Sequence, residues 1–227
     1  MKIIIATIKS WNIAYARTLQ TQLEGEHEIL VFESKEELKL DVVEKFNPDY
    51  IFFPHWSYII KPEIFEHFPC IVFHMTDLPF GRGGSPLQNL IVRGIKQTKI
   101  SAIRVTKTLD EGPVYMKQDL SLEGSAEEIY KRATKIIFEM MIPEFIEKEP
   151  EAVKQEGEVT VFQRRKPEQS ELTTDMSMDK IYDYIRMLDA EGYPNAYLSF
   201  GNKRLTFTKA VQSDGKLTAQ VEISEEA

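Results

Sequence analysis

The sequence lacks several features that would narrow its function at once. Cys70 is the only cysteine in 227 residues, so no internal disulfide bond can form, which favours a reducing, cytoplasmic location. No apolar run approaches the roughly 18 residues of a membrane helix, and the first residues lack the pattern of a secretory leader. We therefore expect a cytoplasmic protein without a membrane partner.

Extended positive charge is also missing. Lys and Arg number 28 against 36 Asp and Glu, the formal net charge is -8, and the longest basic cluster is the triplet at 164–166. Proteins that grip a nucleic-acid backbone usually carry a basic face, so this composition disfavours a nucleic-acid partner. The four histidines and one cysteine show no metal-ligand spacing, so no metal site is expected.

Strand and helix signals alternate along the first part of the chain. Strands are expected at 2–7, 27–32, 49–54 and 70–74, and the third is apolar almost throughout, as in a strand buried on both faces. Helices are expected at 10–23, from a capping box at 34–37 to residue 46, and from Pro62. This alternation predicts an α/β fold with a Rossmann-like, mostly parallel sheet and flanking helices.

The pattern changes beyond residue 98. The runs 99–107 and 113–122 predict a hairpin, and a capping box at 125–128 opens a long helix. The apolar stripe of that helix should pack in the core; it comprises Ile129, Ala133, Ile136, Ile137, Met140 and Met141.

A small C-terminal part is expected after this helix. A charged linker at 147–158 precedes a short strand at 159–162, a helix at 178–188 and three strands at 195–200, 203–210 and 216–223. We therefore predict a Rossmann-like domain at 1–150 and a small α+β subdomain at 151–227.

One histidine and one aspartate stand out chemically. His74 ends a predicted strand and precedes a loop rich in Gly and Pro, a place where sheet enzymes bind ligands. Asp110 lies at the turn of the predicted hairpin. Alone, His74 could be a core histidine bonded to backbone and Asp110 a turn residue. Together they form a pair that can move protons at neutral pH.

The residues around this pair resemble the folate-dependent formyltransferases. The matching positions are His74, Leu78-Pro79, Arg82-Gly83, Pro86, Asp110-Glu111-Gly112, the segment 162–170, Tyr184-Ile185-Arg186 and Tyr193-Pro194-Asn195-Ala196. The resemblance implies that residues 1–150 are the catalytic domain. It also implies that His74 takes a proton from the acceptor amine, and that Asp110 orients and stabilises His74 as a triad carboxylate does.

The resemblance further implies 10-formyltetrahydrofolate as the formyl donor. Its pterin is expected in an apolar slot, the usual setting for a flat heterocycle. The expected lining is Tyr58, Ile59, Ile60, Gly84, Thr106, Lys107, Thr108, Leu109 and Asp110. Simple core packing is the alternative interpretation of residues 58–60.

The sequence departs from the family at one position. The family has Asn two residues before the histidine, where this chain has Val72. Loss of one oxyanion donor typically costs about a hundred- to a thousand-fold in rate. The candidates to replace it are Asn89, His55, Trp56 and the backbone amides near Gly83-Gly84.

The small C-terminal part and the acidic composition resemble the sugar N-formyltransferase branch, of the type found in pseudaminic acid pathways. The expected acceptor is a nucleotide-linked amino sugar, such as UDP-4-amino-4,6-dideoxy-L-N-acetylaltrosamine, used for surface glycans. Arg82, Arg93 and Asn89 are the expected substrate contacts, with solvated surface charge as the alternative for the two arginines. The resemblance also implies a homodimer. The alternatives are a tRNA or glycinamide ribonucleotide acceptor, or a non-catalytic homologue that binds folate or nucleotide.

Overall fold

The computed structural model describes residues 1–225, which form two compact units. The first unit contains Met1–Arg82, Lys99–Leu120 and Lys131–Val161. The second contains Gly83–Thr98, Ser121–Tyr130 and the chain from Phe162 onward. Each unit therefore combines several stretches of sequence, and the division at residue 150 stays a prediction. None of the helices formed by the described residues has the length and apolar character of a membrane span.

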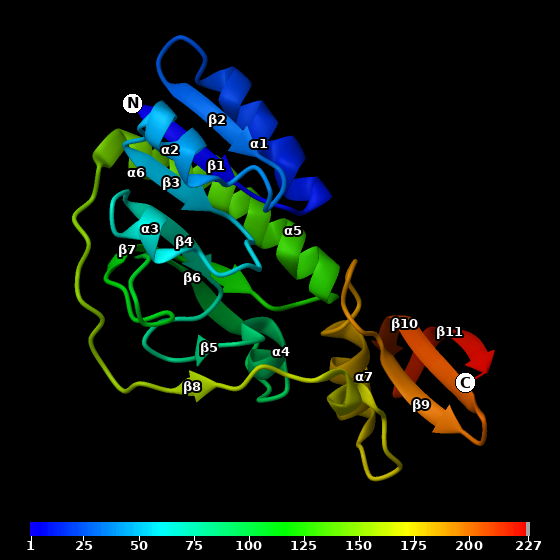
Figure 1. The fold of residues 1–227 in the computed structure, drawn as a ribbon. Helices are drawn as coiled ribbons and strands as arrows, with labels where there is room; N and C mark the ends of the chain where they lie inside the picture. Colours follow the sequence, from blue (N-terminus) through cyan, green and yellow to red (C-terminus); the bar gives the residue numbers. More distant parts are fainter. Residues whose placement is uncertain (226–227) are drawn as a thin grey trace. The chain divides into compact units, whose positions relative to one another are not determined.

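A six-stranded sheet with the order β2-β1-β3-β4-β6-β7 organises the first unit (Figure 1). The strands are β1 (Lys2–Ala6), β2 (Glu28–Phe32), β3 (Tyr50–Phe53), β4 (Cys70–His74), β6 (Gln97–Arg104) and β7 (Val114–Ser121). The first four strands run parallel, and β6 pairs antiparallel with β4. The predicted Rossmann-like, mostly parallel sheet is thus confirmed.

Helices cover both faces of this sheet (Figure 1). They are α1 (Ser10–Gln22), α2 (Leu40–Phe46), α3 (Pro62–Phe65), α5 (Ala126–Ile136) and α6 (Ile142–Lys148). A π-helical turn at Ile137–Met141 joins α5 to α6. The reciprocal hydrogen bonds of the predicted capping box join Ser125 and Glu128 at the start of α5.

Two details of the helix predictions were wrong. The second helix begins at Leu40, because the Ser34 hydroxyl donates to the Glu37 carboxylate at 2.7 Å and the segment closes as a turn. Met140 was expected in the core but is 50% exposed. The π-helical turn changes the periodicity of the stripe at this point, and Met141 beside it is fully buried.

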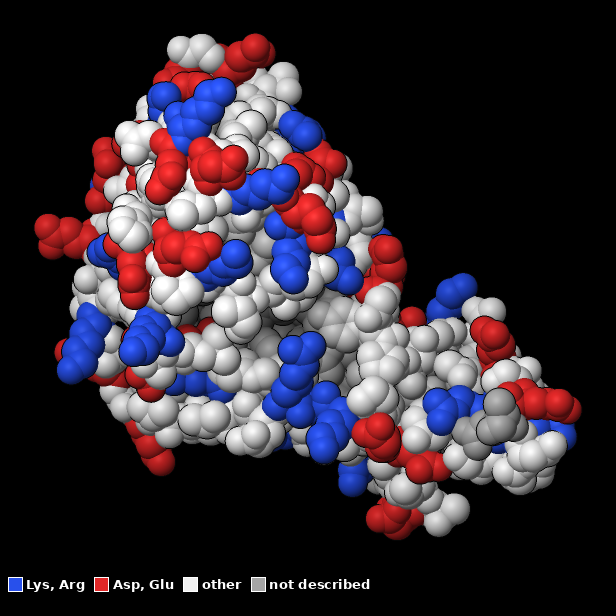
Figure 2. Space-filling model, viewed as in Figure 1, with Lys and Arg blue, Asp and Glu red and all other residues white. Residues whose placement is uncertain are grey.

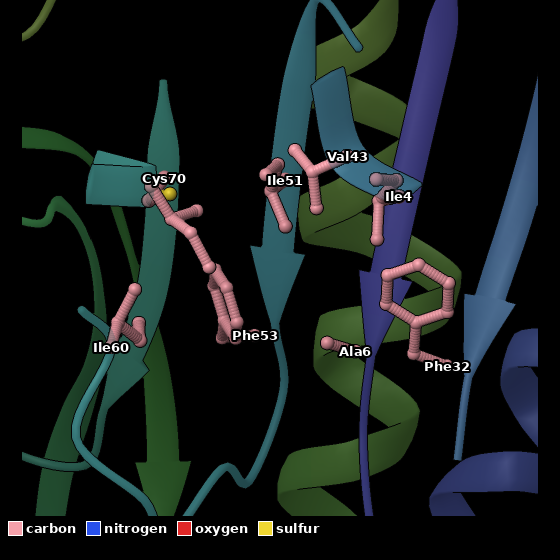
Figure 3. Packing of buried hydrophobic residues seen from close by; sticks show 9 residues of the cluster. Ile4, Ala6, Phe32, Val43, Ile51, Phe53, Ile60 and Cys70 are labelled. Atoms are coloured by element: carbon pink, nitrogen blue, oxygen red, sulfur yellow. The ribbon is translucent and has the colours of Figure 1, made fainter. Parts of the chain in front are cut away.

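The core on one face of the sheet gathers apolar side chains from β1, β3 and β4 under α2 and α3. Figure 3 shows these side chains; the buried cluster is Ile4, Ala6, Phe32, Val43, Ile51, Phe53, Ile60, Ile64 and Cys70. Burial raises the pKa of the Cys70 thiol to about 12, so this thiol is not a nucleophile at neutral pH.

The opposite face centres on Phe145 of α6. Its ring centroid lies 4.9 Å from that of Tyr50, 5.1 Å from that of Phe52 and 5.0 Å from that of Tyr115. All three pairs are edge-to-face, which is a favourable arrangement of aromatic rings. This cluster joins α6 to β3 and β7.

The second unit contains α4 (Pro86–Ile91), α7 (Met178–Arg186) and an antiparallel sheet of β9 (Ala196–Phe200), β10 (Lys203–Ser213) and β11 (Lys216–Glu225). The predicted helix and three-stranded sheet are confirmed. Arg186 at the end of α7 is buried, and its guanidinium donates to the carbonyls of Leu122 and Gly124 and to the Asp183 carboxylate. Two short strands, β5 (Arg82–Gly83) and β8 (Val161–Phe162), pair with each other.

Several buried polar residues cluster at the carboxyl ends of β1 and β3. The Thr7 hydroxyl and the Asn12 amide both donate to the Pro54 carbonyl, at 2.7 and 3.3 Å. The next residue, His55, has a left-handed backbone with φ 53° and packs edge-on against Trp11. Burial, and then the charge of Lys9, lower the pKa of His55 to about 4.

Removing the Phe145 ring should destabilise the first unit strongly. We expect Phe145→Ala to lower the free energy of unfolding by about 3–5 kcal/mol, because a large buried ring leaves a cavity. The exposed Met140, on the same continuous helical segment, provides the matched control, and Met140→Ala should stay within about 0.5 kcal/mol of the wild type. Urea denaturation measures both, and equal effects would contradict this packing.

The low pKa of His55 predicts an acid-sensitive fold. In the unfolded chain a histidine binds a proton below pH about 6.5, whereas folded His55 stays neutral down to about 4. The unfolded state therefore takes up the proton first, and the free energy of unfolding should fall by about 1–3 kcal/mol as pH drops through this window. His55→Asn, which tolerates the positive φ, should flatten that slope in urea titrations. An unchanged slope would exclude His55 as its source.

Candidate active site

The fold brings His74 and Asp110 together. His74 Nδ1 lies 3.6 Å from Asp110 Oδ1, and the two side chains are only 9% and 10% exposed. His74 is the last residue of β4, and Asp110 lies in the turn between β6 and β7. β6 pairs antiparallel with β4, with Ser101 opposite His74 and Arg104 opposite Ile71, so the strand that leads into this turn lies directly beside β4. The separation exceeds a direct hydrogen bond, and the Asp110 carboxylate would attract the ring only when His74 is protonated.

The other ring nitrogen of His74 fixes its tautomer. Nε2 lies 2.8 Å from the Gly81 carbonyl oxygen. A carbonyl can only accept a hydrogen bond, so Nε2 must carry the proton. In the neutral ring, Nδ1 then holds the lone pair, and it faces Asp110. This differs from the triad arrangement expected from the sequence, in which the carboxylate would fix the tautomer.

Two buried hydroxyl residues hold the loop that supplies Gly81. The Ser101 hydroxyl donates to the Thr76 carbonyl at 2.7 Å and accepts from the Leu78 amide at 3.4 Å. The Thr76 hydroxyl donates to the Gly81 carbonyl at 3.3 Å. Ser101 pairs with His74 across β4 and β6, so strand register was the signal that could have revealed it.

The turn that carries Asp110 has a demanding backbone. Asp110 has φ 56°, in the left-handed region. A Cβ on Gly112 would lie 1.6 Å from the Arg104 carbonyl oxygen, so only glycine fits there. The Arg104 amide donates to the Pro113 carbonyl at 3.0 Å and closes the hairpin. The Asp-x-Gly spacing of the sequence therefore has a steric cause in this chain.

Gln155 lies in the segment 147–158, which was predicted to be a linker, and its side chain binds this turn. Its Nε2 donates to the carbonyls of Asp110 and Gly112, both at 2.8 Å. Its Oε1 accepts from Nε and Nη2 of Arg82, at 3.1 and 2.9 Å. The sequence patterns did not single out Gln155. The available signal was that it is the only amide side chain in the charged stretch 147–158.

The expected substrate contacts make protein contacts of their own. Arg82 donates from Nη1 to Glu111 at 2.9 Å as well as to Gln155, and its side chain is 14% exposed. In the second unit, Arg93 donates to the Asn89 carbonyl and side-chain oxygen and stacks on Phe162. Substrate binding by these residues stays a prediction.

The candidate replacements for the missing family Asn differ in their hydrogen bonds. Val72 pairs with Phe53 and Ile103 across the sheet and offers no donor side chain. The Asn89 amide already donates to three carbonyls, those of Gly84, Ser85 and Gln163. The indole nitrogen of Trp56, in contrast, is buried and has no hydrogen-bond partner among residues 1–225. Of the side chains Asn89 and Trp56, only Trp56 therefore has a buried donor without a partner in the described residues; Trp11 Nε1 and Arg165 Nε share this property.

The residues expected to bind folate are largely exposed. Tyr58 is 44%, Ile59 83% and Leu109 64% exposed, whereas Ile60 is buried. This exposure differs from the expected apolar slot, and folate binding by these residues stays a prediction. Thr106, Lys107 and Thr108 are exposed beside Asp110. Gly84 lies in the second unit, where a Cβ would meet the Arg164 Cβ at 2.6 Å, so its role there is close packing.

A surface hollow of about 480 Å³ lies elsewhere. It is open and is lined by Met1, Lys2, Gly25, Glu26, His27, Glu28 and Asp49. These residues surround the amino ends of β1 and β2, whereas His74 is the last residue of β4, at its carboxyl end. The hollow therefore has no part in the chemistry of His74.

Comparisons with known proteins show which family models and chains are similar to this one. Residues 19–143 match the family model described as "Formyl transferase", and residues 167–224 match "Methionyl-tRNA formyltransferase, C-terminal domain". A solved structure of methionyl-tRNA formyltransferase from Clostridium thermocellum is 59% identical, with 99% of both chains covered and a TM-score of 0.97. Methionyl-tRNA formyltransferase of Rickettsia massiliae (strain Mtu5) is 28% identical over 228 residues, which cover 96% of this chain and 74% of that protein.

A more distant structure shares the fold. HypX from Aquifex aeolicus, in complex with tetrahydrofolic acid, is 17% identical, with a TM-score of 0.74, over 92% of this chain and 38% of that one. This likeness concerns the architecture alone.

The comparisons overturn the expected acceptor. The sugar substrate, the glycan pathway and the exclusion of nucleic acid were wrong, because the 59% identical structure and the 28% identical relative that matches 96% of this chain are both methionyl-tRNA formyltransferases. A small C-terminal part does not identify the sugar branch, since the Clostridium thermocellum chain is matched over 99% of its length. The net charge wrongly argued against a nucleic-acid partner, because it averages over all faces of a protein and hides local basic clusters. The homodimer stays a prediction.

The predicted reaction class is confirmed by the family match. The chain belongs to the formyl transferase family and is a folate-dependent N-formyltransferase whose formyl donor is 10-formyltetrahydrofolate.

Proposed function

We propose that this protein formylates the amino group of methionine carried on tRNA. The observation that carries the proposal is the 59% identity, over the full chain, to a methionyl-tRNA formyltransferase. The paired His74 and Asp110 supply the proton-transfer group that such a reaction needs. Cytoplasmic location remains the expectation for an enzyme with this acceptor.

His74 has the geometry of the general base. The acceptor amine must lose a proton as its nitrogen bonds to the formyl carbon, and the lone pair on Nδ1 can take that proton. The positively charged ring would be stabilised by the Asp110 carboxylate at 3.6 Å. His74 would then return the proton to the folate nitrogen as the bond between that nitrogen and the formyl carbon breaks. The proton and the formyl group are both accounted for, and no further reactant is needed.

Trp56 is the side chain best suited to the developing negative charge on the formyl oxygen. Its indole N–H is buried and unpaired within the described residues. It follows β3, the strand that pairs with β4, and packs against the core cluster that also contacts Val72. A donor in this place would offset the loss of the family Asn.

A tRNA acceptor needs basic side chains for its phosphates. Arg164, Arg165 and Lys166 follow β8, and two of them are exposed. Figure 2 shows Lys and Arg side chains gathered over the stretch between β8 and α7, on a surface where acidic and basic side chains are otherwise interspersed. This local cluster is compatible with a nucleic-acid partner despite the net charge of -8.

Loss of either member of the pair should suppress formyl transfer. We expect His74→Ala to lower kcat by about 10²–10⁴-fold, the usual contribution of a general base. Asp110→Asn should also lower it, because the charged ring loses its counter-charge. Folate binding, measured by fluorescence titration, should remain. His67→Ala removes an exposed histidine after α3 and serves as the control. Near-normal turnover in His74→Ala would contradict the assigned role.

Mass spectrometry of the possible acceptors tests directly which of them receives the formyl group. Purified protein is incubated with 10-formyltetrahydrofolate and either methionyl-tRNA, uncharged tRNA or glycinamide ribonucleotide. We expect one formyl group to appear on methionine released from methionyl-tRNA and none on the other two. Formylation of glycinamide ribonucleotide alone, or folate binding without turnover on any acceptor, would contradict the proposal.

A further inference from the structure

We propose that residues Val153–Thr160, here called the strap, form a positioning element that sets the geometry of His74 and Asp110, with Gln155 as its positioning residue. The strap leaves α6 and follows the edge of the first unit toward β8 (Figure 1). The inference concerns the site for which formyl transfer is proposed above, and it rests on that proposal for its kinetic test only.

The first half of the strap binds the turn that carries Asp110. Val153 and Val114 exchange backbone hydrogen bonds, both 2.8 Å long, which anchor the strap at the start of β7. Two residues later, the Gln155 amide bridges the carbonyls of Asp110 and Gly112. The two accepting carbonyls belong to the residues before and after Glu111, so the Gln155 side chain fixes the backbone of the turn at both positions. The left-handed backbone of Asp110, which costs an ordinary residue roughly 1 kcal/mol or more, is thereby maintained.

The second half of the strap binds the loop that holds His74. The Thr160 carbonyl accepts from the amides of Gly81 and Arg82, at 3.0 and 2.9 Å. The carbonyl of the same Gly81 is the acceptor for His74 Nε2. Gly157, with φ 115°, passes close to Pro79 of this loop. The strap therefore fixes the backbone group that sets the tautomer of His74.

Arg82 connects the two halves. It directly follows Gly81, and its guanidinium donates both to Gln155 and to the Glu111 carboxylate. The loop with His74 and the turn with Asp110 are thus tied to each other as well as to the strap. This explains why Arg82 is 14% exposed and already paired.

Gln155 is suited to this position by its chemistry. It donates two hydrogen bonds from its nitrogen and accepts two from Arg82 at its oxygen. A glutamate could still accept from Arg82 but could not donate to the carbonyls, and an aliphatic residue could do neither. Displacing a catalytic group by about 1 Å can cost on the order of a hundred-fold in rate, so loss of this bridge should act on turnover.

The kinetic test compares Gln155→Leu and Gln155→Glu with the control Lys154→Leu, which changes an exposed neighbour in the same strap. We expect both Gln155 variants to lower kcat about 10- to 100-fold with little change in KM for the folate. Lys154→Leu should leave both constants unchanged. If Gln155→Leu fails to fold by circular dichroism, the comparison rests on Gln155→Glu. A kcat within about twofold of the wild type for a folded Gln155 variant would overturn the inference.

A double-mutant cycle separates positioning from general stability. If Gln155 acts through Asp110, Gln155→Leu should cost little further rate in an Asp110→Asn background. If kcat of the double variant falls by the full product of the two single-variant factors, the two residues act independently, and the inference is overturned.

A spectroscopic readout makes the inference independent of the acceptor. The nitrogen chemical shifts of the His74 ring, assigned among four histidines, should change in Gln155→Leu and not in Lys154→Leu. Unchanged shifts would overturn the positioning role even if methionyl-tRNA proved the right acceptor. Changed shifts in a protein that does not formylate methionyl-tRNA would support the strap and contradict only the proposed function.

Discussion

The hydrogen bond from His74 Nε2 to the Gly81 carbonyl is the constraint on which the candidate site depends. It places the ring proton on Nε2 and directs the lone pair of Nδ1 toward Asp110. Thr76, Ser101 and the strap each contact the backbone that presents this carbonyl. In a protease triad the carboxylate selects the tautomer; here a backbone carbonyl does so, and the carboxylate is left to stabilise positive charge.

The sheet supplies the frame for this arrangement. The parallel strands β1, β3 and β4 lie side by side, and β6, which leads into the turn with Asp110, pairs antiparallel with β4 so that Ser101 lies opposite His74. Aromatic packing on Phe145 and the buried apolar cluster under α2 and α3 hold this frame in place. The two reacting side chains therefore come from elements that are fixed by the core, while the exposed residues 106–109 remain available to a ligand.

The sequence allowed the sheet, the approach of His74 to Asp110 and the reaction class to be predicted. The alternation of apolar strands with capped helices predicted the sheet. His74 lay at the end of a predicted strand and Asp110 at the turn of a predicted hairpin. Gln155 could not be predicted, because its contacts connect residues 43 to 73 positions apart through a segment with no regular structure. The orientation of His74 depends on where the Gly81 carbonyl points, which local sequence does not encode. The acceptor was mistaken because composition reports the whole surface rather than the face that binds.

The tautomer of His74 is the most direct test of this account. The measurement is nitrogen NMR of the protein labelled at its histidine rings, at pH about 9, where an ordinary histidine is neutral. We expect His74 to carry its proton on Nε2 and to have an unprotonated Nδ1. A proton on Nδ1, with Nε2 bare, would mean that the Gly81 carbonyl does not set the ring, and would contradict the central claim.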